Sequence, residues 1–386
     1  MNGLDLLLVM LAVVAAVGGW RLGFLHRLAG WIGAGMGLAL AIVLLPSVVE
    51  RLQLDSDTTI FLVCTAVLVL FASIGQAIGA SIGARIRQGV DTPAARSIDA
   101  VGGALLGVVG VGVIAWLVVP VMADTAGWAA ASARGSVISR LVDEHLPDPP
   151  PQIAELERQL AGGDYPQLFT GLRRAPEAPP PPTGSTVSAE LLERASRSVV
   201  RVQGEACDRI QSGSGFVIDA GLVVTNAHVV AGTDELTLET PDGTRGRGVV
   251  VTFDPSTDLA LVATDLERDP LPVTAPTVGD RGLVLGFPGG GPFAPSPFEV
   301  AERLDATGYD IYDSRLVERD LLALSSQLEP GDSGSAVLRD DGSVIGVAVA
   351  VAPDRPLVAY ALDTSELDAL GAGADGSEVD TGPCIR

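Results

Sequence analysis

The sequence contains no lysine, because all 25 of its basic residues are arginine. A catalytic Ser–Lys dyad is therefore impossible, which removes one class of serine hydrolase. Only three cysteines and three histidines occur among 386 residues, so we expect no metal centre and no other cofactor. Acidic residues outnumber arginines by 47 to 25, and an acidic chain with scattered arginine binds nucleic acid poorly.

Apolar sequence, by contrast, is abundant in the first third of the chain. Mean hydropathy is +0.38 although the net charge is −22. The two values agree if an apolar membrane domain is joined to an acidic soluble domain. A helix needs roughly 20 residues to cross a bilayer, and we predict spans at about 4–20, 28–46, 59–82 and 100–122. The alternative is a set of core helices in a soluble domain.

The arginines of the short loops indicate how these spans are oriented. The first loop carries Arg21 and Arg27, and the loop after the third span carries three arginines. Residues 50–57, between the second and third spans, hold one arginine among three acids. Arginine-rich loops stay in the cytoplasm. We therefore expect both termini and the C-terminal domain on the outer side of the cytoplasmic membrane.

Glycines recur every four residues in the last two spans, as Gly75, Gly79 and Gly83 and as Gly103 and Gly107. Such spacing makes one helix face smooth and lets two backbones approach closely. The pattern favours a membrane bundle that anchors the chain in the lipid bilayer. It also leaves open self-association between copies of the chain.

Two short motifs add to this description of residues 1–125. They are Asn2-Gly3-Leu4-Asp5 and the run from Trp20 to Leu25. With the glycine-rich spans, they resemble the colicin V production protein (CvpA) family. The resemblance implies an all-α membrane domain of four helices.

Residues 126–188 form a proline-rich linker between the two halves. Pro147–Pro151 and Pro179–Pro182 are proline blocks of the kind that favour extended, solvated backbone. Ile153–Leu160 between them predicts a short amphipathic helix. The linker either lifts the C-terminal domain off the bilayer or docks on the surface of that domain.

Residues 189–386 predict an all-β domain. Short β-rich runs alternate with turn signals such as Pro241-Asp242-Gly243 and Asp340-Asp341-Gly342. About a dozen strands in this length favour two small β-barrels over a parallel sheet. Thr364–Leu370 predicts a closing helix with Thr364 as its N-cap. The clearest runs are Ser198–Val202, Gly215–Ile218, Leu222–Thr225, Leu259–Ala263, Leu283–Phe287, Ser343–Val351 and Leu357–Ala361.

Three motifs in this domain carry chemistry. His228, in Thr-Asn-Ala-His, is the one histidine after residue 145, so it must supply any imidazole. Asp258 precedes an apolar strand, where a turn cap is the ordinary explanation. Ser333, in Gly-Asp-Ser-Gly, sits on a tight turn with free backbone N–H groups, as a nucleophile beside an oxyanion hole needs. Each motif alone is weak, and their joint occurrence predicts a triad.

The order and spacing of the three motifs resemble those of trypsin-like and HtrA-like proteases over about residues 190–370. The resemblance implies a chymotrypsin-like double β-barrel in which Ser333 attacks, His228 transfers the proton and Asp258 orients His228. Backbone N–H groups of Gly331 and Ser333 would form the oxyanion hole. The resemblance also places Gln327, an uncharged residue, at the bottom of the specificity pocket and gives the pocket an apolar wall. Such a pocket would prefer substrates with uncharged P1 side chains. The wall residues would be Gly346, Val347 and Ala348.

Cys207 and Cys384 flank this domain. Outside the membrane they can pair, and the alternative is two free thiols. A CvpA-like anchor joined to a trypsin-like domain with two flanking cysteines resembles the MarP family of actinobacterial periplasmic proteases. That resemblance implies substrates in the cell envelope, a role in acid and oxidative stress, and a disulfide that supports activity. A free imidazole has a pKa of about 6.5, so the simple expectation is activity that falls in acid. A membrane stress sensor that binds proteins without cutting them is the alternative function.

Overall fold

The computed structural model describes residues 1–385 with gaps at 53–56, 125–126, 147–174, 207–208 and 371–376. The chain forms two compact units. The first comprises Met1–Val119 with Gly135–Pro149, and the second comprises Pro120–Arg134 with Pro150–Arg386. The helix predicted at Ile153–Leu160, the first proline block and Cys207 lie outside the described residues.

Four long helices make up most of the first unit: α1 (Gly3–Leu22), α2 (Phe24–Leu52), α3 (Asp57–Gln88) and α4 (Pro93–Asp124). All four contain a stretch long and apolar enough to cross a membrane. Their large apolar side chains are mostly exposed in the isolated chain, as a lipid-facing surface requires. Each of the four predicted spans lies within one of these helices, and the chain is a multi-pass membrane protein.

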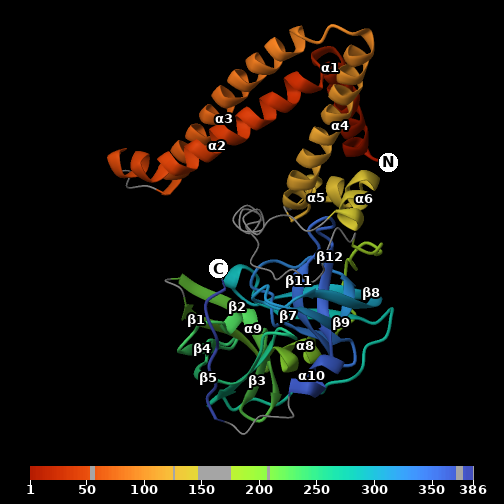
Figure 1. The fold of residues 1–386 in the computed structure, drawn as a ribbon. Helices are drawn as coiled ribbons and strands as arrows, with labels where there is room; N and C mark the ends of the chain where they lie inside the picture. Colours follow the sequence, from red (N-terminus) through yellow and green to blue (C-terminus); the bar gives the residue numbers. More distant parts are fainter. Residues whose placement is uncertain (53–56, 125–126, 147–174, 207–208, 371–376, 386) are drawn as a thin grey trace. The chain divides into compact units, whose positions relative to one another are not determined.

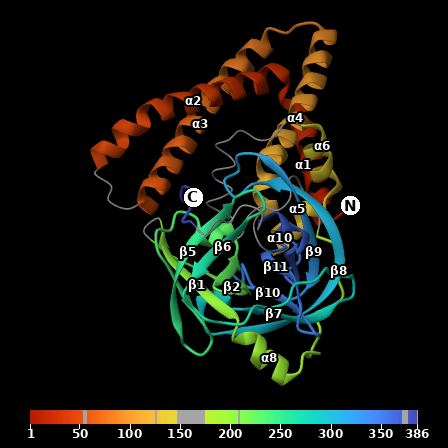
Figure 2. The same cartoon turned by 90° about the horizontal axis from the view of Figure 1, so that it is seen from below.

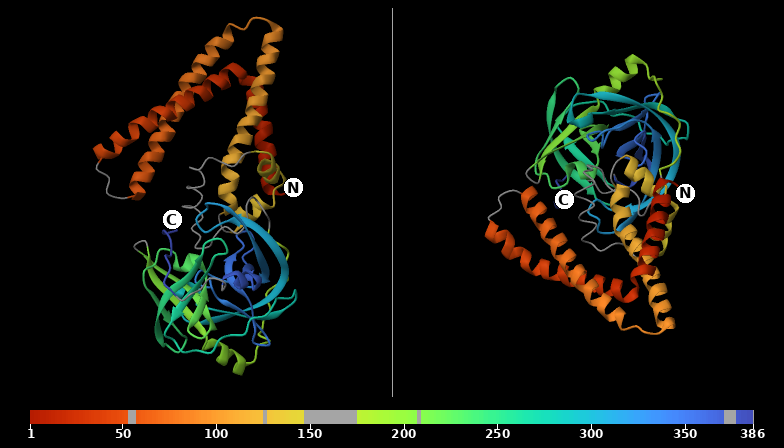
Figure 3. Two further views of the ribbon diagram at one scale, coloured as in Figure 1. Left: turned by 60° about the horizontal axis from the view of Figure 1, so that its bottom comes forward. Right: turned by 90° about the horizontal axis from the view of Figure 1, so that it is seen from above.

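The glycine stripes are used for packing within the chain. A Cβ added to Gly75 of α3 would lie 2.1 Å from the carbonyl oxygen of Gly33 in α2, and Gly79 is equally close to Ala29. Gly103 of α4 is closed off in the same way by Gly19 of α1. Figure 3 shows α2 running beside α3, and α1 beside α4. Helices can approach this closely only where side chains are absent.

A buried carboxylate joins the first helix to α6 (Val137–His145) within this unit. The Asp5 side chain is fully buried and accepts hydrogen bonds from the Ser136 hydroxyl, at 2.6 Å, and from the backbone N–H groups of Val137 and Ile138. The first N–H groups of a helix have no partner within it. Asp5 supplies that partner and fixes the start of α6 beside the start of α1. The short helix α5 (Trp128–Arg134) belongs to the second unit.

Twelve antiparallel strands in the described part of the second unit close into two barrels, which lie side by side in Figures 1 and 2. The predicted double β-barrel is confirmed, and each of the seven predicted runs falls on a strand. The first barrel contains β1 (Val199–Ala206), β2 (Arg209–Asp219), β3 (Leu222–Thr225), β4 (Leu236–Glu239), β5 (Arg245–Asp254) and β6 (Leu259–Thr264). The second contains β7 (Arg281–Gly286), β8 (Ala294–Tyr309), β9 (Leu316–Ser325), β10 (Ala336–Arg339), β11 (Val344–Val351) and β12 (Val358–Asp363).

A single apolar cluster connects the two barrels. Phe216 and Leu259 of the first barrel and Leu285 and Leu338 of the second belong to it, and all four are fully buried. Fully burying a side chain of this size stabilises the fold by about 1.5–3 kcal/mol. Because the barrels share this core, the loops at their junction are held in fixed positions, and the predicted catalytic motifs lie on those loops.

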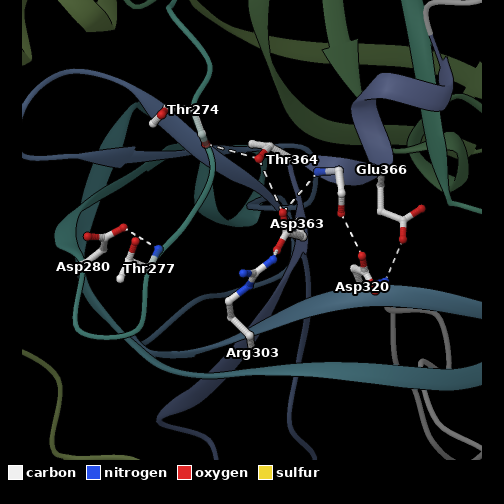
Figure 4. A network of polar contacts seen from close by, with 9 residues as sticks. Thr274, Thr277, Asp280, Arg303, Asp320, Asp363, Thr364 and Glu366 are labelled. Carbon is white, nitrogen blue, oxygen red and sulfur yellow. Dashed lines mark hydrogen bonds and ion pairs between the residues drawn. The ribbon is translucent and has the colours of Figure 1, made fainter.

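Short helices complete the second unit, namely α8 (Ala189–Ser196), α9 (Ala227–Val230), the 3₁₀ turn η1 (Pro288–Gly290) and α10 (Ser365–Leu370). Thr364 precedes α10, but its hydroxyl donates to the Thr274 carbonyl. The Asp363 carboxylate accepts the N–H of Ser365 instead and pairs with Arg303 at 2.7 Å (Figure 4). Thr364 therefore takes the cap position, whereas Asp363 holds the first helical N–H.

The end of the linker docks on the second barrel. The Ala175 N–H donates to Asp354 at 3.2 Å, and the Ser325 hydroxyl donates to the Pro179 carbonyl at 2.7 Å. Ala175 is buried in the contact. Of the two possibilities that the sequence left open, docking therefore holds for residues 175–179.

Candidate active site

The helical turn that carries His228 follows β3 and is fastened to the peptide group of Asp258. The Ala227 N–H donates to the Asp258 carbonyl oxygen at 3.1 Å, and the Asn226 side-chain amide donates to the same oxygen at 2.9 Å. Asn226 and Ala227 are fully buried. The motif predicted from the sequence thus serves to lock the turn of α9 onto the loop between β5 and β6.

His228 and Asp258 face each other directly. Their closest contact joins His228 Nδ1 to Asp258 Oδ2 at 2.7 Å, and the His228 backbone N–H donates to Oδ1 at 2.8 Å. The Asp258 side chain is fully buried, and 11% of the His228 side chain is exposed. A carboxylate at this distance favours the tautomer with the proton on Nδ1, which leaves Nε2 free to accept a proton.

Asp258 has a backbone φ of +61°, in the left-handed region that L residues rarely adopt. Conformations of this kind cost about 1–3 kcal/mol and persist only where the surroundings over-determine them. The hydrogen bonds to Asn226, Ala227 and His228 are part of those surroundings. In this strained conformation, both carboxylate oxygens of Asp258 contact His228.

Ser333 lies on a turn made possible by the glycines on either side of Asp332-Ser333. Gly331 has φ +98° and Gly334 has φ +86°. A Cβ on Gly334 would lie 2.1 Å from the Ser214 carbonyl oxygen, and one on Gly331 would lie 2.6 Å from that of Phe287. Both positions therefore need glycine for conformation and for space. Ser333 itself is 4% exposed.

Strand β2 brings the serine and histidine segments together. The Ser214 N–H donates to the Ser333 carbonyl at 2.8 Å. At the neighbouring Gly213, the space for a Cβ is bounded by the Val229 side chain and by the Ser333 carbonyl oxygen. Val229 follows His228 in α9, so both predicted motifs lie against this one buried glycine.

Two backbone N–H groups at the serine turn have no partner among the described residues: those of Gly331 and Ser333. The N–H of the intervening Asp332 donates to the Glu329 carbonyl at 3.0 Å, and that of Gly334 donates to Ala348 at 2.8 Å. The Ser214 hydroxyl donates to the Gly331 carbonyl at 2.7 Å and so fixes the orientation of that residue. Free donors of this kind can hold an oxyanion.

Asp332 is a buried carboxyl beside the nucleophile that sequence reasoning did not weigh. It is 3% exposed, and burial raises its pKa to about 6, with a smaller contribution from Glu329. The Glu329 N–H, at 2.9 Å from Oδ2, opposes this rise. Ser214 is the other contributor that was missed. A motif search could flag Asp332 by its place next to Ser333, whereas Ser214 lies over a hundred residues away.

The predicted pocket residues lie in two places. Gln327 is exposed, after β9. Ala348 lies beside the serine turn, because its N–H donates to the Ser335 carbonyl at 3.0 Å. Gly346 and Val347 lie farther along β11, fully buried between β10 and β12. Their assignment to a specificity pocket stays a prediction.

The two cysteines in the described part of the chain differ in state. Cys64 of α3 is half-buried and is the free cysteine of the described part of the chain. Cys384 is not a free thiol, and its Sγ lies against Gly232, four residues after His228. Because Cys207 lies outside the described residues, the pairing of Cys207 with Cys384 stays a prediction.

Comparison with known proteins matches each half of the chain to a protein family. Residues 4–147 match the colicin V production protein family, and residues 213–347 match the trypsin-like peptidase domain. Serine protease Rv3671c of Mycobacterium tuberculosis is 30% identical over 99% of this chain and 98% of its own length. The putative serine protease HhoA of Synechocystis is 32% identical over 41% of each chain. The crystal structure of Rv3671c protease in its active form shares 32% identity, with a TM-score of 0.49, over 55% of this chain and 99% of that one.

Proposed function

Because the chain belongs to the MarP family of membrane-anchored serine proteases, which combine a colicin V production domain with a trypsin-like domain, we propose that it cleaves peptide bonds through Ser333, His228 and Asp258. The chain is a serine endopeptidase by its relatives and its trypsin-like domain. The observation that supports the triad most is the double contact of the Asp258 carboxylate with His228.

In the proposed reaction, His228 Nε2 takes the proton of the Ser333 hydroxyl while Ser333 Oγ attacks the substrate carbonyl. Asp258 Oδ2, 2.7 Å from Nδ1, holds the ring and stabilises the imidazolium that forms. The N–H groups of Gly331 and Ser333 would receive the developing oxyanion. His228 then returns the proton to the leaving amine, and water releases the acyl group by the same route.

A fluorophosphonate probe tests this assignment on the full-length chain in detergent micelles. We expect one labelled serine in the wild type, no labelling in Ser333→Ala, and a strong loss of labelling rate in His228→Ala. Ser326→Ala is a matched control, because Ser326 is a buried serine whose hydroxyl donates to the Pro297 carbonyl. Labelling that survives Ser333→Ala would remove Ser333 from the reaction.

The proposed location of the protease domain is the outer side of the cytoplasmic membrane. Support comes from the loop arginines and from relatives described as probable periplasmic serine endoproteases. The proposed substrates are cell-envelope proteins, which the enzyme would cut after uncharged P1 residues during acid and oxidative stress. Outside the cytoplasm, Cys207 would pair with Cys384.

Fusion of alkaline phosphatase, which folds only outside the cytoplasm, to the C-terminus tests the location of the protease domain. An inactive fusion at normal expression would contradict it.

Self-association in the membrane is a further part of the proposal. The glycine faces of α3 and α4 are occupied by α2 and α1, so association between copies would use other helix faces. A non-catalytic stress sensor is the alternative function. The sensor predicts that Ser333→Ala leaves the cellular function intact, whereas the protease predicts its loss.

A further inference from the structure

Arg319 of β9 is a buried cation that the reaction described above does not use. It is 2% exposed and is the largest of the fully buried side chains. Its Nε donates to the Ser256 carbonyl at 2.7 Å, and one terminal nitrogen donates to the Tyr309 carbonyl at 3.1 Å. A buried guanidinium is costly to desolvate unless charges and hydrogen bonds compensate.

The two carbonyls that Arg319 binds belong to different barrels. Tyr309 ends β8 of the second barrel, whereas Ser256 lies in the loop of the first barrel that presents Asp258 two residues later. Arg319 thus reaches across the junction between the barrels and holds the loop just before the catalytic carboxylate.

The hairpin between β8 and β9 supplies two more contacts to the same loop. The Ile311 N–H donates to the Pro255 carbonyl at 3.1 Å, and Arg315 donates to the Ser256 hydroxyl. Within the loop, Asp254 accepts the Ser256 N–H at 2.8 Å and the Thr257 hydroxyl at 3.0 Å. Successive residues before Asp258 are therefore each fixed.

The charges around Arg319 also point to the active site. Burial lowers the pKa of Arg319 from its ordinary value. Nearby negative charges raise this pKa again, and the charge of Asp258 contributes most to that rise. Smaller contributions come from Glu366, Asp310 and Asp254. Asp258 is fully buried, so its interaction with a buried cation is weakly screened by solvent.

We propose that Arg319 is a positioning residue, which holds the loop before Asp258 in the strained conformation that aims the carboxylate at His228. The φ of +61° at Asp258 needs surroundings that over-determine it, and the Arg319 contact with Ser256 provides a part of them from the opposite barrel. The inference rests on the proposed triad. It means that the β8–β9 hairpin of one barrel supports the catalytic acid of the other.

A double-mutant cycle tests this on the full-length chain in detergent micelles. The variants are Arg319→Met, Asp258→Asn and the two together, assayed with fluorescein-labelled casein. Active sites of the wild type and of Arg319→Met are counted by fluorophosphonate titration carried to completion, whereas the two variants with Asp258→Asn, which react too slowly with the probe, are normalised to the amount of folded protein measured by circular dichroism. We expect Arg319→Met to lower kcat per titrated site roughly tenfold to a hundredfold with KM nearly unchanged. Asp258→Asn should lower kcat by roughly 10⁴. The double variant should match Asp258→Asn, because effects that act through one residue do not add.

Arg281→Met is the matched control, since Arg281 pairs with Glu299 at the surface of the second barrel, and its kcat should equal that of the wild type. If Arg319→Met does not fold, Arg319→Lys replaces it, with an expected loss of about threefold to tenfold that again vanishes beside Asp258→Asn. A purely structural role would lower the number of titrated sites and leave kcat per site unchanged.

Unchanged turnover per site in both Arg319 variants would overturn the inference. An undiminished loss in the Asp258→Asn background would do the same. Either result, with labelling that still depends on Ser333, leaves the triad intact. Labelling that persists in Ser333→Ala would instead refute the triad and the inference with it.

Discussion

Replacing Asp332 by asparagine should stabilise the protease domain at neutral pH. Asp332 is almost fully buried beside the nucleophile, and burial raises its pKa from the ordinary 3.8 to about 6. Each pKa unit corresponds to about 1.4 kcal/mol. Ionisation of Asp332 in the folded domain therefore costs about 3 kcal/mol relative to ionisation in the unfolded chain.

The sign of the pH dependence follows from which state holds the proton. Between pH 4 and pH 6 the unfolded chain has lost the Asp332 proton, whereas the folded domain still binds it. Folding stability from this group therefore falls as pH rises through that window, and stays lower above it. Asparagine does not ionise, so the advantage of Asp332→Asn should be near zero at pH 4 and approach about 3 kcal/mol at pH 8.

The asparagine side chain also suits the site. Its oxygen can accept the Glu329 N–H that Asp332 Oδ2 now accepts at 2.9 Å. The space beside Gly286 is bounded by Asp332 Oδ1 and by the Ser335 hydroxyl, a buried group with no hydrogen-bond partner in the described structure. An amide N–H placed there can donate to Ser335, so the substitution removes a charge and gives the Ser335 hydroxyl a partner.

Urea unfolding of residues 175–386, followed by circular dichroism from pH 4 to pH 8, measures this difference. Tryptophan fluorescence is unsuitable, because all four tryptophans lie before residue 129. Asp341→Asn is the contrasting control, since Arg339 lowers the pKa of the exposed Asp341 from its ordinary 3.8. The stability that its ionisation provides is fully present well above pH 3.8, so this variant should be less stable than the wild type by a nearly constant amount from pH 5 to pH 8. A free-energy difference for Asp332→Asn that is the same at every pH would refute the reasoning.

Three other substitutions have clear expected outcomes. Gly334→Ala should destabilise the protease domain by more than about 1 kcal/mol and lower kcat/KM, because φ is +86° and the new methyl would meet the Ser214 carbonyl; unchanged urea unfolding would contradict this. Gly75→Leu should separate α2 from α3, seen as a lower Tm of the full-length protein in detergent, whereas Gly112→Leu, where the structure has open space, should not. Tyr312→Phe should remove a loss of stability between pH 10 and pH 12, since burial raises the pKa of Tyr312 to about 12 and the folded chain keeps the proton longer; an unchanged alkaline profile would argue against it.

The parts of the fold that the sequence predicts are those with a strong local period or composition. The four spans and the strands at Leu222–Thr225 and Ser343–Val351 are apolar runs, and the structure contains them with small shifts of their ends. Strand β8 has no apolar run. It contains Pro295 and Pro297, and the alternation of apolar with polar residues that marks a strand is broken at Ala301 and Glu302, where the register with β9 shifts. Its pairing with β7 and β9 is what makes the whole segment one strand.

In the candidate site, too, the residues that lie in local motifs could be predicted, whereas those defined by long-range contacts could not. His228, Asp258 and Ser333 lie in short motifs whose chemistry can be interpreted locally. Arg319 and Ser214 lie in no motif, and their roles depend on contacts between segments that are more than 60 residues apart. Whether a polar residue is buried, and which carbonyl it meets, is decided by the packing of the two barrels. The sequence could not supply those contacts, because each needs the register of two strands from different parts of the chain.

The C-terminal tail is expected to support the loop that follows His228. Thr381 accepts the Gly232 N–H at 3.2 Å and the Tyr312 hydroxyl at 3.3 Å, and its own hydroxyl donates to the Thr233 carbonyl at 3.0 Å. The Val379 N–H adds a bond to the Val250 carbonyl of β5. The tail thus joins both barrels beside the turn that carries His228.

Deleting residues 377–386 removes these four hydrogen bonds, the bond from Arg209 to the Ile385 carbonyl, and Cys384, which is not a free thiol. At roughly 1 kcal/mol for each of the five hydrogen bonds, the domain should lose at least about 5 kcal/mol of stability. Thr381→Ala removes the hydroxyl donor alone and should cost about 1 kcal/mol. Because Gly232 and Thr233 follow α9 directly, the deletion should also lower kcat per titrated site, whereas Thr381→Ala should lower it far less. Urea unfolding and active-site titration measure both quantities. A tail deletion that lowers stability yet leaves turnover per site unchanged would show that the tail does not reach the catalytic histidine.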